Sequence, residues 1–278
     1  MRKLFTMTAA ILLLAACSAE KSALEDKQSG AEPVKKEARN HNQEAEKKEE
    51  EQEKVESAKQ EEEISVSPEY KLNQNTFALE PIGEANPKVA LLTIDDAPDE
   101  HALEMAKTLK KLNAPAIFFV NGHLINSPEK EKVIKEIHEL GFMIGNHTYS
   151  HSDLTTLSEA KQKEEILSVN EAVEKIIGEK PKFFRAPFGK NTEYSSQIAT
   201  DENMLLMNWT YGYDWEKEYM TGDAIADIMV NAPQLQDGAN LLMHDREWTN
   251  DGLERIVIGL RDKGYELLDP ALIDSESE

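Results

Sequence analysis

Short apolar runs alternate with longer amphipathic stretches from about residue 76 to the end of the chain. The runs are almost continuously apolar, which is typical of strands buried on both faces. The strands predicted on this basis are 89–95, 116–121, 142–146, 183–186, 205–210, 240–244 and 265–268. Strand–helix alternation of this kind predicts an α/β domain in which helices cover a parallel sheet. About seven strands favour a closed or nearly closed barrel over an open sheet.

Start and stop residues bound the helices predicted between these strands. Ser127 followed by Pro128 is typical of a helix start, and Gly141 is typical of the residue that follows a helix. The helices predicted in this way cover about 127–141, 158–177, 223–230 and 253–263.

The first 65 residues differ in composition from the rest. Residues 1–16 have a basic start and a short apolar stretch, which is typical of a secretory signal and too short to span a bilayer. The sequence 14–17, Leu-Ala-Ala-Cys, resembles a bacterial lipoprotein signal, so we predict a lipid anchor at Cys17 rather than an ordinary export signal. Residues 17–65 are dense in Glu, Lys, Gln and Ala and predict a disordered, charged spacer, which leaves 66–278 as the folded domain.

The chain is strongly acidic, with a formal net charge of −22. Phosphates would be repelled, which argues against nucleic acid as a partner. The same charge disfavours docking on anionic wall polymers through charge alone, so a neutral substrate fits better. The chain has 1 cysteine, which excludes an intramolecular disulfide bond.

Two adjacent carboxylates at the end of the first apolar run are the most informative residues. Asp95 and Asp96 follow the run 89–94, where a buried carboxylate pair is costly unless a cation neutralises it. His147 and His151, four residues apart after another predicted strand, can supply two further ligands. Taken alone, the first motif also fits a helix cap and the second a surface turn. Together they predict one metal site with room for water and a spare carboxylate, which is typical of a metal-assisted hydrolase.

Three further segments place reactive side chains after predicted strands. Arg185 needs an anion, which the aspartate pair supplies, although a structural salt bridge explains it equally well. The aromatic segment 209–215 around Asp214 fits either a sugar-binding platform or an aromatic core cluster. His244 can protonate a leaving group, although a lone histidine there is more often a core residue. The carboxyl ends of parallel strands share one face of a barrel, so we expect these residues to converge.

In this order the motifs resemble those of the polysaccharide deacetylase family, which is carbohydrate esterase family 4 with its NodB-like domain. The five matching motifs are Asp95-Asp96, His147-x-x-x-His151, Arg185-x-Pro187-Phe188, Asp214-Trp215 and Leu242-x-His244. The resemblance covers roughly residues 86–270 and assigns 66–278 to a NodB-like catalytic domain. It implies a distorted, incomplete (β/α) barrel of about seven parallel strands covered by helices. It also implies bound Zn²⁺, or another divalent metal such as Co²⁺, Ni²⁺ or Mn²⁺.

The resemblance also implies a role for each candidate residue, carried over by position. The metal ligands are Asp96, His147 and His151. The general base is Asp95 held by Arg185, and the general acid is His244 oriented by Asp214. A backbone N–H near Phe188 helps to stabilise the oxyanion, and Trp215 and Leu242 line the pocket for the acetyl methyl group.

The chain departs from the family pattern at four places. Ala97 stands where the family usually has Gly, and Ser152 stands where it usually has Pro. Phe188 replaces the commoner Tyr, and Tyr211 or Gly212 falls where an earlier Asp is usual. None of these changes removes a ligand, the base or the acid. We expect the first and the last to affect substrate choice or rate.

The sequence therefore predicts a monomeric, metal-dependent polysaccharide N-deacetylase, anchored through Cys17 to the extracytoplasmic face of the cell membrane. Its expected substrate is a neutral N-acetylated polysaccharide: peptidoglycan, at N-acetylglucosamine or N-acetylmuramic acid, or chitooligosaccharide. Three alternatives stay open. They are a xylan-type O-acetyl esterase, a catalytically silent wall-glycan-binding lipoprotein that retains the metal, and a transporter-associated solute-binding lipoprotein that shares only the lipidation signal.

Overall fold

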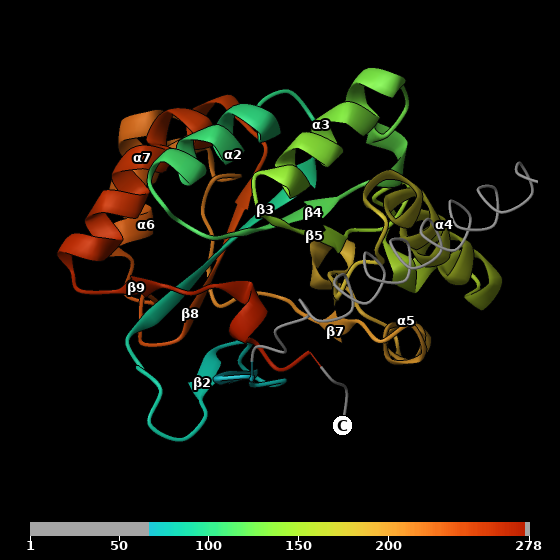
Figure 1. Cartoon of the computed structure of the whole chain (residues 1–278), viewed down its shortest axis with the longest axis horizontal. Helices are drawn as coiled ribbons and strands as arrows, with labels where there is room; N and C mark the ends of the chain where they lie inside the picture. The colour runs from blue at the N-terminus through green and yellow to red at the C-terminus, as the bar shows by residue number, and fades with distance from the viewer. Residues whose placement is uncertain (1–66, 276–278) are drawn as a thin grey trace, which may run out of the picture. The chain divides into compact units, whose positions relative to one another are not determined.

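A curled parallel sheet forms the centre of the computed structural model, which describes residues 67–275 (Figure 1). The sheet has seven strands in the order β7-β6-β5-β4-β3-β8, and β9 pairs with the start of β3. The strands are β3 (Val89–Ala97), β4 (Ile117–Val120), β5 (Met143–Asn146), β6 (Phe183–Phe184), β7 (Leu205–Leu206), β8 (Ala239–His244) and β9 (Glu266–Leu267). All their pairings are parallel. The segment after β7 meets β8 at the isolated bridge between Tyr211 and Leu241 and not in a continuous strand pairing, so the barrel is distorted and incomplete, as predicted.

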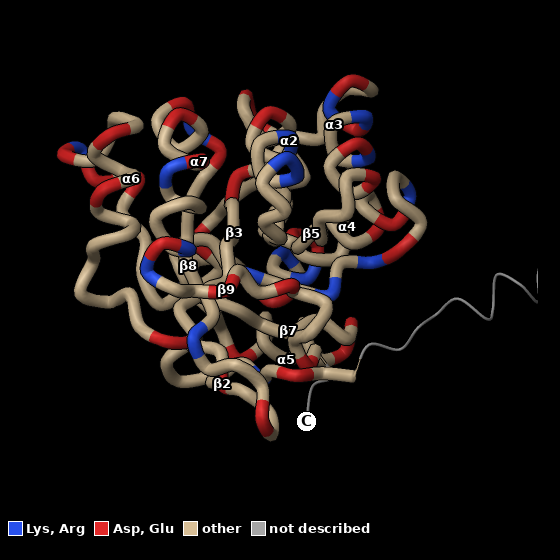
Figure 2. The backbone as a smooth tube through the Cα atoms, turned by 60° about the vertical axis from the view of Figure 1, so that its left-hand side comes forward, with Lys and Arg blue, Asp and Glu red and all other residues tan. Residues whose placement is uncertain are grey.

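Helices cover the outside of this sheet (Figure 1). The helices are α2 (Ala102–Lys111), α3 (Pro128–Glu139), α4 (Glu159–Ile177), α5 (Glu193–Asp201), α6 (Gly222–Asn231) and α7 (Glu247–Asp262). Figure 2 shows Asp and Glu positions along these helices, with Lys and Arg positions interspersed. No helix in the described range 67–275 is long and apolar enough to cross a membrane.

Alternating residues of the strands build two separate cores. Leu92, Ile94 and Phe118 belong to the cluster that includes the apolar faces of the helices. Leu91 and Phe119 point to the other face, into a cluster completed by the hairpin of β1 (Tyr70–Leu72) and β2 (Leu79–Pro81). Both faces of the central strands are therefore buried, which explains their continuous apolar sequence. The charged side chains of these strands lie at their carboxyl ends.

The predicted strands and helices are present, and two further strands and two further α-helices are not among the predictions. Helix α7 begins at Glu247, earlier than the predicted start at residue 253. The β1–β2 hairpin, α2 and α5 were missed. The predicted signal 1–16, the lipidated Cys17 and the spacer 17–65 lie outside the described residues. The predicted domain 66–278 extends beyond the described range at residue 66 and at residues 276–278.

Candidate active site

The polar residues at the strand ends converge on one cavity of about 550 Å³. All the candidate site residues of the domain except Arg185 line this cavity. Arg185 lies behind it, fully buried. The cavity sits at the carboxyl ends of the strands, which is where barrel enzymes of this class hold their reacting groups.

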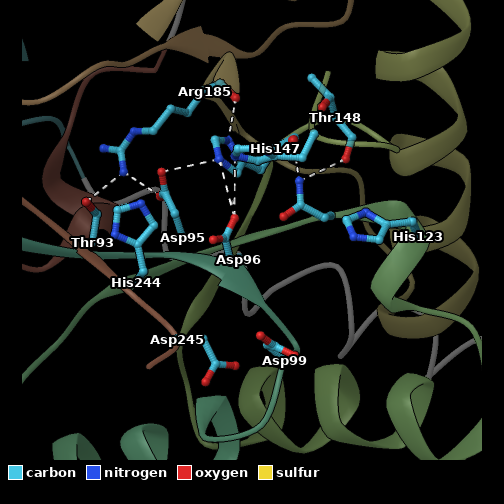
Figure 3. A network of polar contacts seen from close by, with 12 residues as sticks. Thr93, Asp95, Asp96, Asp99, His123, His147, Thr148, Arg185, His244 and Asp245 are labelled. Atoms are coloured by element: carbon cyan, nitrogen blue, oxygen red, sulfur yellow. Dashed lines mark hydrogen bonds and ion pairs between the residues drawn. The ribbon is translucent and has the colours of Figure 1, made fainter. Parts of the chain in front are cut away.

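The aspartate pair lies near the carboxyl end of β3, just before its last residue, Ala97. Asp95 is buried with 2% of its surface exposed, and Asp96 has the positive φ of 64°. A non-glycine residue in this left-handed region is uncommon and is held there by its surroundings. The unusual backbone turns the Asp96 carboxylate toward the histidines that follow β5 (Figure 3).

Asp96, His147 and His151 form a three-ligand group. The Oδ1 atom of Asp96 lies 3.9 Å from Nε2 of His147 and 3.6 Å from Nε2 of His151. One ligand atom from each residue lies within 4.8 Å of the others. Ligand atoms around a tetrahedral Zn²⁺ ion lie about 3.4 Å apart, given bonds near 2.1 Å, so the two distances from Asp96 are within about 0.5 Å of that spacing.

The hydrogen bonding of His147 fits metal binding. Its Nδ1 atom lies 2.8 Å from the carbonyl oxygen of Arg185, and because a carbonyl only accepts, Nδ1 is the protonated nitrogen. The lone pair is therefore on Nε2, which faces Asp96. A second hydrogen bond that fixes the tautomer in this way is typical of metal-ligating histidines. Two imidazoles and one carboxylate with open positions suit Zn²⁺.

The charges around the three-ligand group favour the forms that bind a metal. Burial acts to raise the pKa of Asp96, but His244, His147, His151 and Arg246 together hold it below its ordinary value. Burial and the neighbouring His147 lower the pKa of His151. The carboxylate is therefore ionised and His151 is neutral at neutral pH, as metal ligands must be.

A buried ion pair holds the other aspartate. Nη1 of Arg185 donates to Oδ1 of Asp95 over 2.6 Å and to the Thr93 hydroxyl over 2.8 Å (Figure 3). The rest of the guanidinium donates to the carbonyls of Met207 and Asn208. Oδ2 of Asp95 lies 3.5 Å from Nε2 of His147, so this carboxylate stands directly beside the three-ligand group.

His244 stands on the neighbouring strand, in register with Asp95. Its Nδ1 lies 2.7 Å from Oδ1 of Asp214, and its backbone N–H donates to Oδ2 of the same carboxylate over 2.6 Å. Burial acts to lower the pKa of His244, but the hydrogen bond and charge of Asp214 outweigh it and raise the pKa. A histidine with a raised pKa beside a cavity is suited to give a proton to a substrate.

The predicted pocket residues form the outer wall of the cavity. Trp215 stacks edge to face on His244, with ring centroids 5.6 Å apart, and Phe188 meets His151 in the same way at 4.8 Å. Both aromatic side chains are exposed on their other side. Leu242 is almost fully buried, with 3% of its surface exposed, and lines the cavity. The cavity therefore has a polar floor and an aromatic rim.

The structure accommodates the departures from the family pattern. Ala97 is buried in the helix-side core, and the positive φ falls on Asp96 instead, so the Ala97 methyl group causes no backbone strain. Tyr211 points into the core, where its hydroxyl donates to the Met229 carbonyl. A Cβ on Gly212 would lie 2.4 Å from the Leu242 carbonyl oxygen, so this close approach requires glycine.

The hydroxyl of Ser152 lies 2.7 Å from that of Ser150, which also contacts Glu165. The loop that carries His151 is therefore tied to α4 by side-chain hydrogen bonds at the position where the family usually has proline.

Several residues of the site were missed at the sequence level. Arg246 and Trp248 line the cavity, and Arg246 contacts Asp96. Thr249, which donates to Asp214, was also missed. Trp209 lines the cavity as well, and it belongs to the predicted aromatic segment 209–215. Arg246 lies two residues after the end of β8, so the pattern of reactive residues after strands that singled out His244 also applies to it.

Comparisons with known proteins agree with this geometry. The polysaccharide deacetylase family model matches residues 82–206. The chain is 30% identical over 189 residues to the peptidoglycan-N-acetylmuramic acid deacetylase PdaA of Bacillus subtilis, covering 66% of this chain and 70% of PdaA. It is 29% identical over 204 residues to a peptidoglycan-N-acetylglucosamine deacetylase of Bacillus cereus, covering 70% and 72%.

Two further matches bear on function. The uncharacterized protein YlxY of Bacillus subtilis is 32% identical over 194 residues, which is 68% of this chain, and the chain spans only 58% of its length. A crystal structure of a CE4 family pseudoenzyme from Bacillus anthracis superposes with a TM-score of 0.59 at 28% identity, covering 66% of this chain and 64% of the other.

Proposed function

Because the chain belongs to the polysaccharide deacetylase family, we propose that it is a metal-dependent N-deacetylase of cell-wall glycans. The observation that carries this proposal is the convergence of Asp96, His147 and His151 in one cavity, with Asp95 beside them. The ion proposed is Zn²⁺, with Co²⁺, Ni²⁺ and Mn²⁺ as alternatives, and it would be held by those three residues. A divalent ion held there would acidify a water molecule and polarise the acetyl carbonyl group.

The residues of the chain supply the proton transfers of this hydrolysis. Asp95 takes the proton from the attacking water, and Arg185 orients its carboxylate. His244 gives a proton to the departing nitrogen, and the hydrogen bond from Nδ1 to Asp214 raises the pKa of that histidine. Asp95 and His244 are Cα partners on adjacent parallel strands, so one cavity presents the base for the water and the acid for the departing nitrogen from neighbouring positions. The products are acetate and a free amine.

The favoured substrate is peptidoglycan, at N-acetylglucosamine or N-acetylmuramic acid, or chitooligosaccharide. Two relatives are named as peptidoglycan deacetylases, one for each of these two sugars. The exposed aromatic rim of Phe188 and Trp215 suits the apolar face of a neutral sugar ring. We further propose that Cys17 carries a lipid, which would place the domain at the outer face of the cell membrane, next to this polymer.

Acetate release tests the enzymatic proposal. Purified, metal-loaded protein is incubated with peptidoglycan, chitooligosaccharide and acetylxylan, and acetate and bound metal are both quantified. We expect acetate from the first or second polymer and loss of both metal and activity in Asp96→Ala. Asp223→Ala, which changes an aspartate in an exposed ion pair with Arg255, is the matched control and should behave as the parent.

Three results would contradict the proposal or redirect it. Activity on acetylxylan alone would favour the O-acetyl esterase. Metal binding with tight retention of wall fragments and no acetate would favour the catalytically silent alternative, which the pseudoenzyme relative makes worth testing. A parent protein that binds no metal would refute the site itself.

A further inference from the structure

The two oxygens of the Asp96 carboxylate have different partners. Oδ1 faces the Nε2 atoms of His147 and His151. Oδ2 accepts a hydrogen bond of 2.7 Å from Nη2 of Arg246, on the other side. A carboxylate held in this way offers a single oxygen to an ion between the histidines, because the second is engaged by a strong, charge-assisted donor.

The guanidinium of Arg246 is itself fixed by its surroundings. Its Nη1 donates to Oδ2 of Asp99 over 3.2 Å and to the carbonyl of Asp245 over 3.0 Å. The segment that carries it is tied to the end of β3, because the Asp245 N–H donates to the Asp95 carbonyl. The carboxylate of Asp245 in turn accepts the backbone N–H of His101 over 2.6 Å. In the view of Figure 3, Asp99 and Asp245 lie on the side of Asp96 away from His147.

We propose that Arg246 is a positioning residue that holds Asp96 as a one-oxygen metal ligand. This inference rests on the proposed metal site. It assigns to Arg246, which follows β8, the role of orienting the metal ligand Asp96 on β3. Asp96 needs such support, because its positive φ of 64° is an uncommon backbone conformation that the surroundings must stabilise. Without Arg246, its carboxylate is free to rotate about the side-chain bonds away from the histidines.

Two effects of Arg246 on a bound cation oppose each other. Its positive charge repels the ion, and its hydrogen bond orients the ligand. Asp99 stands 3.2 Å from the same guanidinium and offsets much of its charge. The orientation therefore prevails, and removal of Arg246 should weaken metal binding, as loss of a partner that orients a metal ligand does by about 10–100-fold.

Metal titration of four proteins tests this inference. Arg246→Met removes the donors and keeps the volume of the stem, and Arg246→Lys keeps the charge with a single donor group. Arg255→Met breaks an exposed pair with Asp223 and is the matched control. Zn²⁺ and Co²⁺ dissociation constants are measured by competition with a chelating dye, and the visible spectrum of the Co²⁺ forms reports the coordination number. Thermal unfolding in chelator checks that each variant folds.

We expect the dissociation constant of Arg246→Met to rise about 10-fold or more, that of Arg246→Lys to fall between it and the parent, and the control to be unchanged. The Co²⁺ spectrum of Arg246→Met should change in intensity, because Oδ2 of Asp96 becomes available to the ion. Unchanged affinity and spectrum in Arg246→Met, with normal metal binding by the parent, would overturn the role of Arg246 and leave the proposed function standing. A parent that binds no metal would overturn both.

Discussion

Replacing Asp95 by asparagine tests how much the buried ion pair between Asp95 and Arg185 stabilises the protein. Arg185 and Asp95 have 0% and 2% of their side-chain surfaces exposed, and their charged atoms lie 2.6 Å apart. Asparagine keeps the size of the side chain and an oxygen that accepts a hydrogen bond, but it carries no charge. The Arg185 guanidinium would then be a buried cation without its counter-charge.

The structure sets the size of the expected effect. Removing one partner of a buried ion pair costs about 3–5 kcal/mol of unfolding free energy. Arg185 keeps its hydrogen bonds to the Met207 and Asn208 carbonyls in the variant, so the cost should fall near the lower end of that range. The matched control is Asp223→Asn, because Asp223 and Arg255 have side chains 89% and 49% exposed. Such an exposed pair contributes about 0–1 kcal/mol.

Two measurements separate the structural role of Asp95 from its chemical role. Urea unfolding in the presence of a chelator gives the stability without any contribution from bound metal. Acetate release by the metal-loaded variants gives the activity, which we expect to fall by about 10²–10⁴-fold in Asp95→Asn. A loss of less than about 1 kcal/mol would refute the charge-balance reasoning. Normal acetate release by a destabilised variant would instead refute the assignment of Asp95 as the base.

Three further changes probe the acid and the rim. Asp214→Asn removes the hydrogen-bonded charge that raises the pKa of His244 against the effect of burial. Because His244 must be protonated to act, the alkaline limb of the pH–rate profile should move to lower pH, and an unmoved limb would contradict the pairing. Gly212→Ala places a methyl group 2.4 Å from the Leu242 carbonyl oxygen and should lower the free energy of unfolding by about 1–3 kcal/mol, measured by urea unfolding. An unchanged midpoint would show that the backbone segments of Gly212 and Leu242 move apart without cost. Trp215→Ala should raise KM for oligosaccharides more than it lowers kcat, because its ring is 44% exposed beside His244; a loss confined to kcat would place the ring in the chemistry instead.

The fold was predictable where burial dictates the sequence. The strands around Leu91 and Phe119 are apolar on both faces because each face meets a separate core, and this pattern reads directly as a parallel sheet. Helix α2 was missed although Met105 and Leu109 have helical spacing, so its signal was available. Helix α5 is different, because a capping box between Thr192 and Ser195 fixes its start and its apolar face is short.

The positions of the candidate site residues were predictable from one rule, that reactive residues follow the strands of a parallel sheet. That rule placed Asp96, His147 and His244 at one end of the barrel, where the structure has them. It could not assign partners, because hydrogen bonds across the barrel depend on register and backbone angles. The bond from Arg246 to Asp96 joins positions 150 residues apart in the sequence, and the left-handed backbone of Asp96 has no sequence signal of its own.

The departures from the family pattern lie away from the proton-transfer groups, and this bears on the catalytically silent alternative. Ala97 packs into the helix-side core, and Tyr211 is buried against the Met229 carbonyl, so neither occupies the cavity. Asp95 keeps its arginine and His244 keeps its aspartate. An inactive protein that still binds metal would therefore direct the search to the rim of Phe188 and Trp215, which a glycan must pass to reach these groups.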